Sequence, residues 1–198
     1  MPVRILLATS NSGKLREYRE LASGTTLEID LLPEFRDFPA FGESAPTFAE
    51  NSAGKALHYS QFTSEIVLAD DSGLVVPALG GAPGVHSARY AGPNATSEDR
   101  VRKLLREMEG KAGEERRARF VCVITIARQG RALAVLSDCA KGIIAIEPRG
   151  ANGFGYDPIF CFSNDRRTYA EASSEEKNIA SHRGKAFRKL VELLIPAK

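Results

Sequence analysis

Apolar and polar segments alternate over the first quarter of the chain. Val3 to Ala8 is apolar and ends at the polar turn Thr9 to Gly13, and apolar residues from Leu15 to Ala22 then recur at helical spacing. Leu27 to Leu32 is a second apolar segment, and Pro33 to Pro46 is a loop marked by proline and glycine. The pattern predicts a strand, a helix, a second strand and a loop long enough to be functional.

Further helices are predicted along the chain. Thr47 to Glu50 matches a capping box and precedes an alanine-rich helix that carries Lys55. Thr96 to Asp99 repeats the cap pattern, and apolar residues from Val101 to Met108 have the i, i+3, i+4, i+7 spacing of an amphipathic helix. We interpret that helix as scaffold. A last helical region begins at Ser173.

The apolar segment Ile66 to Leu68 leads into two adjacent carboxylates, Asp70 and Asp71. Neighbouring side chains of a strand point to opposite faces, so the two can share a face only where the strand breaks. Ser72-Gly73 predicts such a turn, with a separate strand at Leu74 to Val76. The pair indicates either a solvated turn or a site for a hard divalent cation such as Mg²⁺, with one carboxylate on the metal.

The second half of the chain predicts antiparallel strands. Phe120 to Ala127 and Ala132 to Leu136 flank the turn Gln129-Gly130 and form a predicted hairpin. Ile143 to Ile146, after a glycine, is a further candidate strand. Strand and helix alternation followed by this meander predicts an α/β fold with a mixed β-sheet.

Composition narrows the class of protein. A chain of 198 residues with 43% hydrophobic residues predicts one domain, residues 1–198. The formal net charge of +2 gives no reason to expect nucleic acid or an acidic membrane as partner, and no apolar run approaches a membrane-spanning length. Three widely spaced cysteines fit neither a disulfide framework nor a zinc site. We therefore expect a soluble, cytoplasmic protein.

A polar loop at the start of the first helix is the first candidate site. Backbone amides at a helix start favour anions, and a lysine beside them adds positive charge for phosphate. A P-loop would need Gly at Ala8 and Ser or Thr at Leu15, so the loop is not assigned to that class. A capped helix with a solvated lysine explains the pattern equally well. The residues of the loop are Thr9, Ser10, Asn11, Ser12, Gly13 and Lys14.

Two further groups of residues are candidates. Glu43 and Lys55, with the two aspartates, suit a metal-bound phosphate group, whereas Glu50 is better explained by the capping box. An aromatic side chain can stack on a base while polar groups read its edge. Phe154 could equally lie in the core, and Arg183 could serve as a helix charge. The residues of this third group are Phe154, Gly155, Tyr156, Asp157, Lys177, His182 and Arg183.

Six motifs, in this order, resemble those of the Ham1/RdgB family of purine nucleoside triphosphate pyrophosphatases. They span nearly the whole chain, and together they are specific where each alone is weak. The motifs are Thr9-x-Asn11-x-Gly13-Lys14, Thr47-Phe48-x-Glu50-Asn51-x-x-x-Lys55-Ala56, Ala69-Asp70-Asp71-Ser72-Gly73-Leu74, Gly80-Gly81-Ala82-Pro83-Gly84-x-x-Ser87-Ala88-Arg89-Tyr90, Gly153-Phe154-Gly155-Tyr156-Asp157-Pro158 and Glu176-Lys177-Asn178-x-x-Ser181-His182-Arg183-Gly184.

The resemblance implies hydrolysis of inosine, deoxyinosine and xanthosine triphosphates to the monophosphate and pyrophosphate. It implies Mg²⁺ as cofactor, a homodimer, and an elongated mixed β-sheet flanked by helices, with two lobes and a cleft between them. The sequence departs from the family pattern at Ala45, where Gly is usual, at Ser52, where Ala is usual, and at Ala172, where Leu is common.

The resemblance also implies roles for individual residues. The loop from Thr9 to Lys14 and Lys55 would hold the phosphates, and Glu43 and Asp71 would bind the metal. Asp71 would also activate the attacking water, with Asp70 beside it. The residues that would touch the remainder of the substrate are Ser72, Phe154, Asp157, Lys177, His182 and Arg183.

Two other functions are compatible with such a site. A nucleotide-binding regulator would keep the site without hydrolysis, although a binder has no need for a water-activating carboxylate beside a metal. A metal-dependent phosphatase acting on a terminal phosphate would release orthophosphate instead of pyrophosphate.

Overall fold

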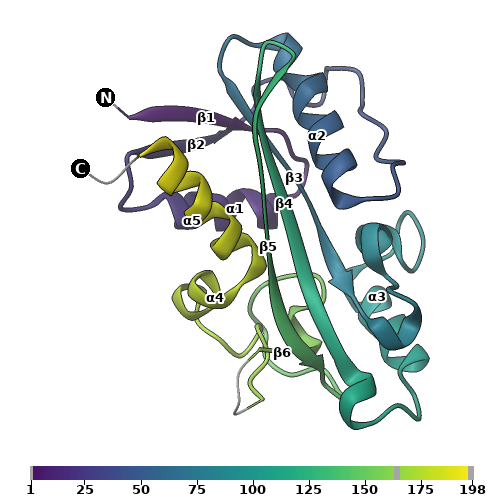
Figure 1. Ribbon diagram of the computed structural model, residues 1–198. Coiled ribbons are helices and arrows are strands. Elements are labelled where there is room, and N and C mark those ends of the chain that lie inside the picture. The colour runs from purple at the N-terminus through teal and green to yellow at the C-terminus, as the bar shows by residue number, and fades with distance from the viewer. Residues whose placement is uncertain (1, 163–165, 196–198) are drawn as a thin grey trace. The chain divides into compact units, whose positions relative to one another are not determined.

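The computed structural model describes residues 2–162 and 166–195, and within them six strands form one sheet in the order β2-β1-β3-β4-β5-β6 (Figure 1). β1 pairs in parallel with β2 and with β3, and β5 pairs antiparallel with β6. The sheet is therefore mixed, as the sequence predicts. The strands are β1 (Val3–Leu7), β2 (Leu27–Leu31), β3 (Ile66–Val75), β4 (Arg117–Arg128), β5 (Arg131–Ile144) and β6 (Phe160–Cys161).

Helices flank the sheet and begin at the predicted caps. Thr47 accepts a hydrogen bond from the backbone of Glu50, and Thr96 and Ser173 each take part in a complete capping box. None of the helices in residues 2–162 and 166–195 is long and apolar enough to span a membrane. The helices are α1 (Ser12–Ala22), α2 (Phe48–Tyr59), α3 (Ser97–Glu107), α4 (Ser174–Ala180) and α5 (His182–Leu194), with short 3₁₀ helices at Ser60–Phe62, Pro77–Leu79, Gly84–Arg89, Gly113–Arg116 and Asp157–Ile159.

The chain folds into two compact units, each with its own core. The first unit comprises Met1–Asp71, Cys122–Asp138 and Arg183–Lys198, and the second comprises Ser72–Val121 and Cys139–His182. Three of the boundaries fall inside strands: after Asp71 in β3, after Val121 in β4 and after Asp138 in β5. The expected cleft between two lobes stays a prediction.

Helices α1 and α2 of the first unit pack on opposite faces of β1. Tyr18 of α1 belongs to the same core cluster as Ile5 and Leu7. Ala56 of α2 belongs to another cluster with Leu6. Because the chain places β2 on one side of β1 and β3 on the other, the carboxyl ends of β1 and β3 form a topological switch point. Ligands of open α/β sheets bind at such points.

Two predicted strand breaks are wrong. β3 runs without interruption through Ser72-Gly73, because β4 remains its neighbour in the sheet after the pairing with β1, which covers only Ile66 to Leu68, has ended. β5 likewise continues through Gly142, so the two strands predicted around it are one. A Cβ atom at Gly142 would lie 2.6 Å from the ring of Phe160. The glycine therefore allows close approach of the Cys161 carbonyl and the Phe160 ring, and it does not end the strand.

Candidate active site

Asp70 and Asp71 lie on opposite faces of β3. The strand is regular at this point, so alternation sends the two neighbouring carboxylates in opposite directions. Leu68 belongs to the core cluster of α1 and α5, whereas Val67 and Ala69 belong to the cluster of α2. Asp70 therefore faces α1 and α5, and Asp71 faces α2.

The carboxylate of Asp70 is held in a buried ion-pair network. Lys14 Nζ lies 2.8 Å from Asp70 Oδ1, and Arg183 Nη2 lies 3.3 Å from Asp70 Oδ2. Arg183 Nη1 lies 2.5 Å from Glu17 Oε2. Burial by itself would raise the pKa of Asp70, but the charges of Lys14 and Arg183 hold that pKa well below its usual range. Asp70 thus stays ionised as the counterion of two cations.

Asp71 has a different environment. Asn51 Nδ2 donates to Asp71 Oδ2 at 3.0 Å. Burial raises the pKa of Asp71 to about 6. The negative charge of Glu43 adds to this rise, whereas Lys14 and the Asn51 amide oppose it. A carboxylate whose proton is easily gained and lost near neutral pH is suited to acid–base chemistry.

The predicted phosphate loop is an ordered cap on α1. Asn11 Oδ1 accepts from the backbone amides of Gly13 and Lys14, at 2.9 and 3.2 Å. The hydroxyl oxygen of Thr9 accepts from the amide of Asn11. The loop lines a cavity of about 520 Å³ together with the start of the loop after β2. Of the predicted residues, Thr9, Ser10, Asn11 and Ser12 border this cavity.

Lys55 and Glu43 form an ion pair, with Lys55 Nζ 2.5 Å from Glu43 Oε1. No group of three or more His, Cys, Asp and Glu side chains that could hold a metal occurs in the described part of the chain. Mg²⁺ is often bound by one or two carboxylates, with water and substrate phosphate as its other ligands. The negative charge of Glu43 raises the pKa of Asp71, and these two carboxylates are ligands of the type that such a cation takes.

The second unit gathers part of the predicted base-binding group. Lys177 Nζ lies 2.5 Å from Asp157 Oδ2 and 5.1 Å from the centre of the Phe154 ring. Asp157 Oδ2 also accepts from the backbone amide of Phe154 at 2.7 Å. Gly155 has a φ of 65°, which a side chain would disfavour. Tyr156 is buried in the core and its hydroxyl donates to the carbonyl of Ser87, so it holds the loop in place.

The remaining predicted residues are placed separately. His182 is buried and stacks on Phe120, with ring centres 4.7 Å apart and ring planes 9° apart. Arg183, the next residue, belongs to the first unit and pairs with carboxylates there, so its reading of a base stays a prediction. Ser72 follows Asp71 in β3 and is partly buried. Glu50 accepts from the hydroxyl of Thr47, a variant of the predicted capping box.

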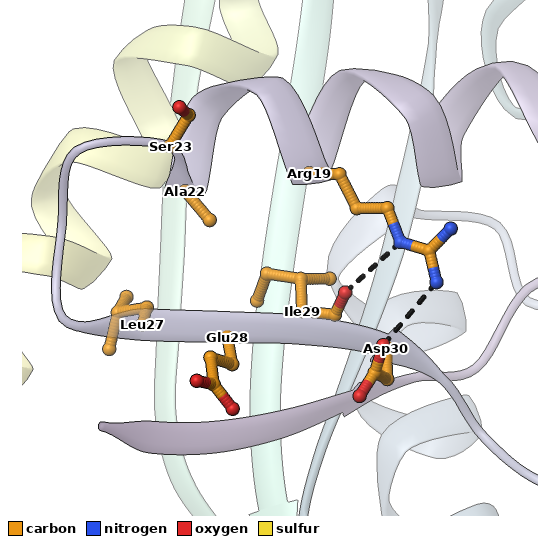
Figure 2. Close-up of a pocket in the computed structure, with 7 residues that line it drawn as sticks. All are labelled: Arg19, Ala22, Ser23, Leu27, Glu28, Ile29 and Asp30. Carbon is orange, nitrogen blue, oxygen red and sulfur yellow. Dashed lines mark hydrogen bonds and ion pairs between the residues drawn. The ribbon is translucent and has the colours of Figure 1, made fainter. Parts of the chain in front are cut away.

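A separate hollow of about 400 Å³ lies at the edge strand β2 (Figure 2). Arg19 reaches across it from α1, donates to the carbonyl of Ile29 at 3.3 Å and pairs with Asp30. The residues that line it are different from the predicted site residues. Because Arg19 donates to a backbone carbonyl of the edge strand β2, we interpret this side chain as protection of the sheet edge against pairing with another strand.

Sequence reasoning assigns no role to two buried polar residues of the candidate site. Glu17 is 6% exposed and Asn51 is 1% exposed, each on a helix turned toward the sheet. Glu17 directly precedes Tyr18 of the apolar stripe, and an ionisable residue beside such a stripe is the one signal for it. Asn51 is a position of the second of the six motifs, but nothing in the sequence assigns it a role.

Comparisons with known proteins agree over most of the chain. A model of the Ham1 family matches residues 5–193. The chain is 48% identical over 188 residues to the dITP/XTP pyrophosphatase of Geobacillus kaustophilus (strain HTA426), covering 95% of this chain and 92% of that protein. It is 44% identical over 190 residues to the dITP/XTP pyrophosphatase of Bacillus licheniformis, covering 96% and 97%. A solved structure of a HAM1 protein from Coxiella burnetii has a TM-score of 0.85 and 44% identity, covering 98% of this chain and all of that one.

Proposed function

The chain belongs to the Ham1 family, and we propose from this premise that it hydrolyses inosine, deoxyinosine and xanthosine triphosphates to the monophosphate and pyrophosphate. The similarity to proteins named dITP/XTP pyrophosphatase supports the substrate class. The observation that carries the proposal is the position of Asp71, a carboxylate at the switch point of the sheet, fixed by Asn51 on the face opposite the ion-paired Asp70.

In the proposed mechanism Asp71 accepts a proton from the attacking water as the water oxygen bonds to one phosphorus of the α–β anhydride. The bond from that phosphorus to the bridging oxygen breaks, and the products are the monophosphate and pyrophosphate. Lys55 and Lys14 lie beside the carboxylates of Glu43 and Asp70 and offset the charge of the triphosphate. Glu43 and Asp71 would hold Mg²⁺, which would supply charge stabilisation at the phosphate oxygens. Phe154 stacks on the purine, and Lys177 and Asp157 keep the loop around it ordered.

The proposal also covers the domain organisation, the oligomeric state and the cellular location of the enzyme. We propose a single catalytic domain over residues 1–198, a homodimer, and a place in the cytoplasm. All three cysteines are present as thiols and not as disulfides, which supports a reducing compartment. Light scattering on the purified protein would test the dimer, with a monomeric mass as the contradicting result.

A product assay tests the proposed function. The protein is incubated with inosine triphosphate and Mg²⁺, and pyrophosphate and orthophosphate are measured separately. Release of pyrophosphate with the monophosphate is the expected result. Orthophosphate with the diphosphate would identify a terminal phosphatase instead, and tight binding without either product would identify a regulator.

A further inference from the structure

The side-chain amide of Asn51 contacts Asp71 and also the backbone of the loop that carries Glu43, the other proposed metal ligand. Asn51 Oδ1 accepts from the backbone amide of Ala45 at 3.0 Å, and Asn51 Nδ2 donates to the carbonyl of Ala45 at 3.2 Å. The same nitrogen donates to Asp71 Oδ2 at 3.0 Å. Ala45 lies two residues after Glu43. One buried side chain therefore fixes the end of the loop that carries Glu43 and also fixes the carboxylate of Asp71.

The loop after β2 has no regular structure of its own but is anchored along its length to α2 and the following turn. Three aromatic residues spaced three apart supply the contacts. The Phe35 and Tyr59 rings lie 4.7 Å apart, and Phe38 stacks on Phe62 at 4.5 Å. Phe41 is the third, and its ring meets α2 at Gly54. The rings attach the loop at regular intervals.

Hydrogen bonds between side chains of α2 and the backbone of the loop strengthen the same attachment. His58 Nε2 lies 2.7 Å from the carbonyl oxygen of Pro39, and the hydroxyl of Tyr59 accepts from the amide of Phe41 at 3.2 Å. A Cβ atom at Gly54 would lie 2.5 Å from Phe41 Cζ, closer than carbon atoms approach. Glycine at this position therefore lets the loop lie directly on α2.

We propose that Asn51 is a positioning residue for metal binding, and that the aromatic anchor of the loop at Gly54 supports it. The inference rests on the proposed function, because it takes Glu43 and Asp71 as the ligands of Mg²⁺. The Asn51 amide is hydrogen-bonded to Asp71 and Ala45 without bringing a charge of its own to the site. Groups that orient metal ligands typically change metal affinity by about 10- to 100-fold when removed.

The test measures binding of Mn²⁺ to the protein without substrate, by electron paramagnetic resonance. Asn51→Leu keeps the approximate shape of the side chain and removes the amide. We expect this variant to bind Mn²⁺ about 10- to 100-fold more weakly than the unmodified protein. Asn94→Leu makes the same substitution at an exposed residue of the second unit and is expected to bind Mn²⁺ normally.

Gly54→Val is the second variant and leaves both Asn51 and Asp71 in place. Its larger side chain displaces the Phe41 ring and with it the loop, so we also expect weaker Mn²⁺ binding. It decides the question if Asn51→Leu does not fold, which thermal unfolding of each variant would reveal. Unchanged Mn²⁺ affinity in a folded Asn51→Leu protein would overturn the proposal. If the Asn51→Leu protein is unfolded, unchanged Mn²⁺ affinity in Gly54→Val would overturn it.

The proposed function can fail separately. Absence of pyrophosphate release by the unmodified protein would refute the activity but would leave the Mn²⁺ measurement interpretable. Release of pyrophosphate together with unchanged Mn²⁺ affinity in the folded variants would support the activity and refute the role of Asn51.

Discussion

The two faces of β3 show how one strand places two neighbouring carboxylates in different environments. On the face toward α1 and α5, Asp70 neutralises Lys14 and Arg183. Burial raises the pKa of Asp70, but these two cations outweigh it and hold that pKa well below the usual range. On the face toward α2, Asp71 has an amide partner, and burial raises its pKa to about 6.

The difference follows from alternation along the strand. Adjacent carboxylates in a turn would share solvent and repel each other, whereas adjacent carboxylates in a strand point away from each other and can be tuned separately. Both carboxylates are buried, so burial and nearby charges set each pKa; Lys14 lowers the pKa of both, but only Asp70 pairs directly with it and with Arg183. We infer that the Asp70 face holds the structure together and that the Asp71 face carries the chemistry.

The largest expected effect is on turnover. Asp71→Asn keeps the shape of the side chain but removes the proton acceptor and one charge, so kcat should fall on the order of 10³-fold. Steady-state kinetics with inosine triphosphate, on protein whose circular dichroism matches the unmodified protein, would measure it. Turnover within a few-fold of normal would remove Asp71 from the mechanism.

Arg183 offers the next test, because its ion pairs place it on the Asp70 face. Arg183→Met leaves Glu17 and Asp70 as buried carboxylates without this cation, and should lower the free energy of unfolding by about 3 to 5 kcal/mol. Denaturant unfolding measures that loss. Kinetics on inosine and adenosine triphosphates test the base-reading prediction in the same protein. Unchanged stability with a compressed ratio between the two substrates would assign Arg183 to the base.

A smaller effect separates phosphate contacts from base contacts. Lys55→Ala should lower kcat/KM by a similar factor for every purine triphosphate, because the phosphates are common to all of them. Phe154→Ala should cost about 1 to 3 kcal/mol of binding, by a factor that varies with the base. Comparing kcat/KM for both variants across several bases provides the check, and a base-dependent loss in the Lys55 variant would count against these roles.

The smallest expected effect is a change in thiol reactivity. Burial raises the pKa of Cys122 to about 12, and its Sγ lies 3.9 Å from Asp70 Oδ2. At pH 8 we expect rapid alkylation of the half-buried Cys139 and slow alkylation of Cys122. Loosening the network with Asp70→Asn should speed the labelling of Cys122, as followed by mass spectrometry. Equal rates at Cys122 with and without the substitution would mean that Asp70 does not hold that face closed.

Much of the fold could be predicted from the sequence, because local patterns determine it. The strand and helix at the start, the cap at Thr96 and the hairpin around Gln129-Gly130 each follow from nearby residues. The break predicted at Ser72-Gly73 was wrong because sheet pairing outweighs the local preference of glycine for turns.

Most residues of the candidate site could be predicted, but the hydrogen bonds and ion pairs between them could not. The carboxylates and lysines were identified by motif, whereas the pairing of Arg183 with Glu17 joins residues 166 positions apart. The contact of Asn51 with Asp71 likewise depends on how α2 packs on the sheet. Such contacts are set by tertiary packing, which local patterns do not encode.

Denaturant unfolding of Asp70→Asn and Asp71→Asn, measured side by side, tests the separation of the two faces most directly. Both substitutions remove one negative charge from neighbouring residues of the same strand, so each is the control for the other. We predict that Asp70→Asn lowers the free energy of unfolding by about 3 kcal/mol or more, because Lys14 and Arg183 lose their shared counterion, and that Asp71→Asn changes it by less than about 1 kcal/mol. Equal losses in the two variants, or a larger loss in Asp71→Asn, would contradict the account.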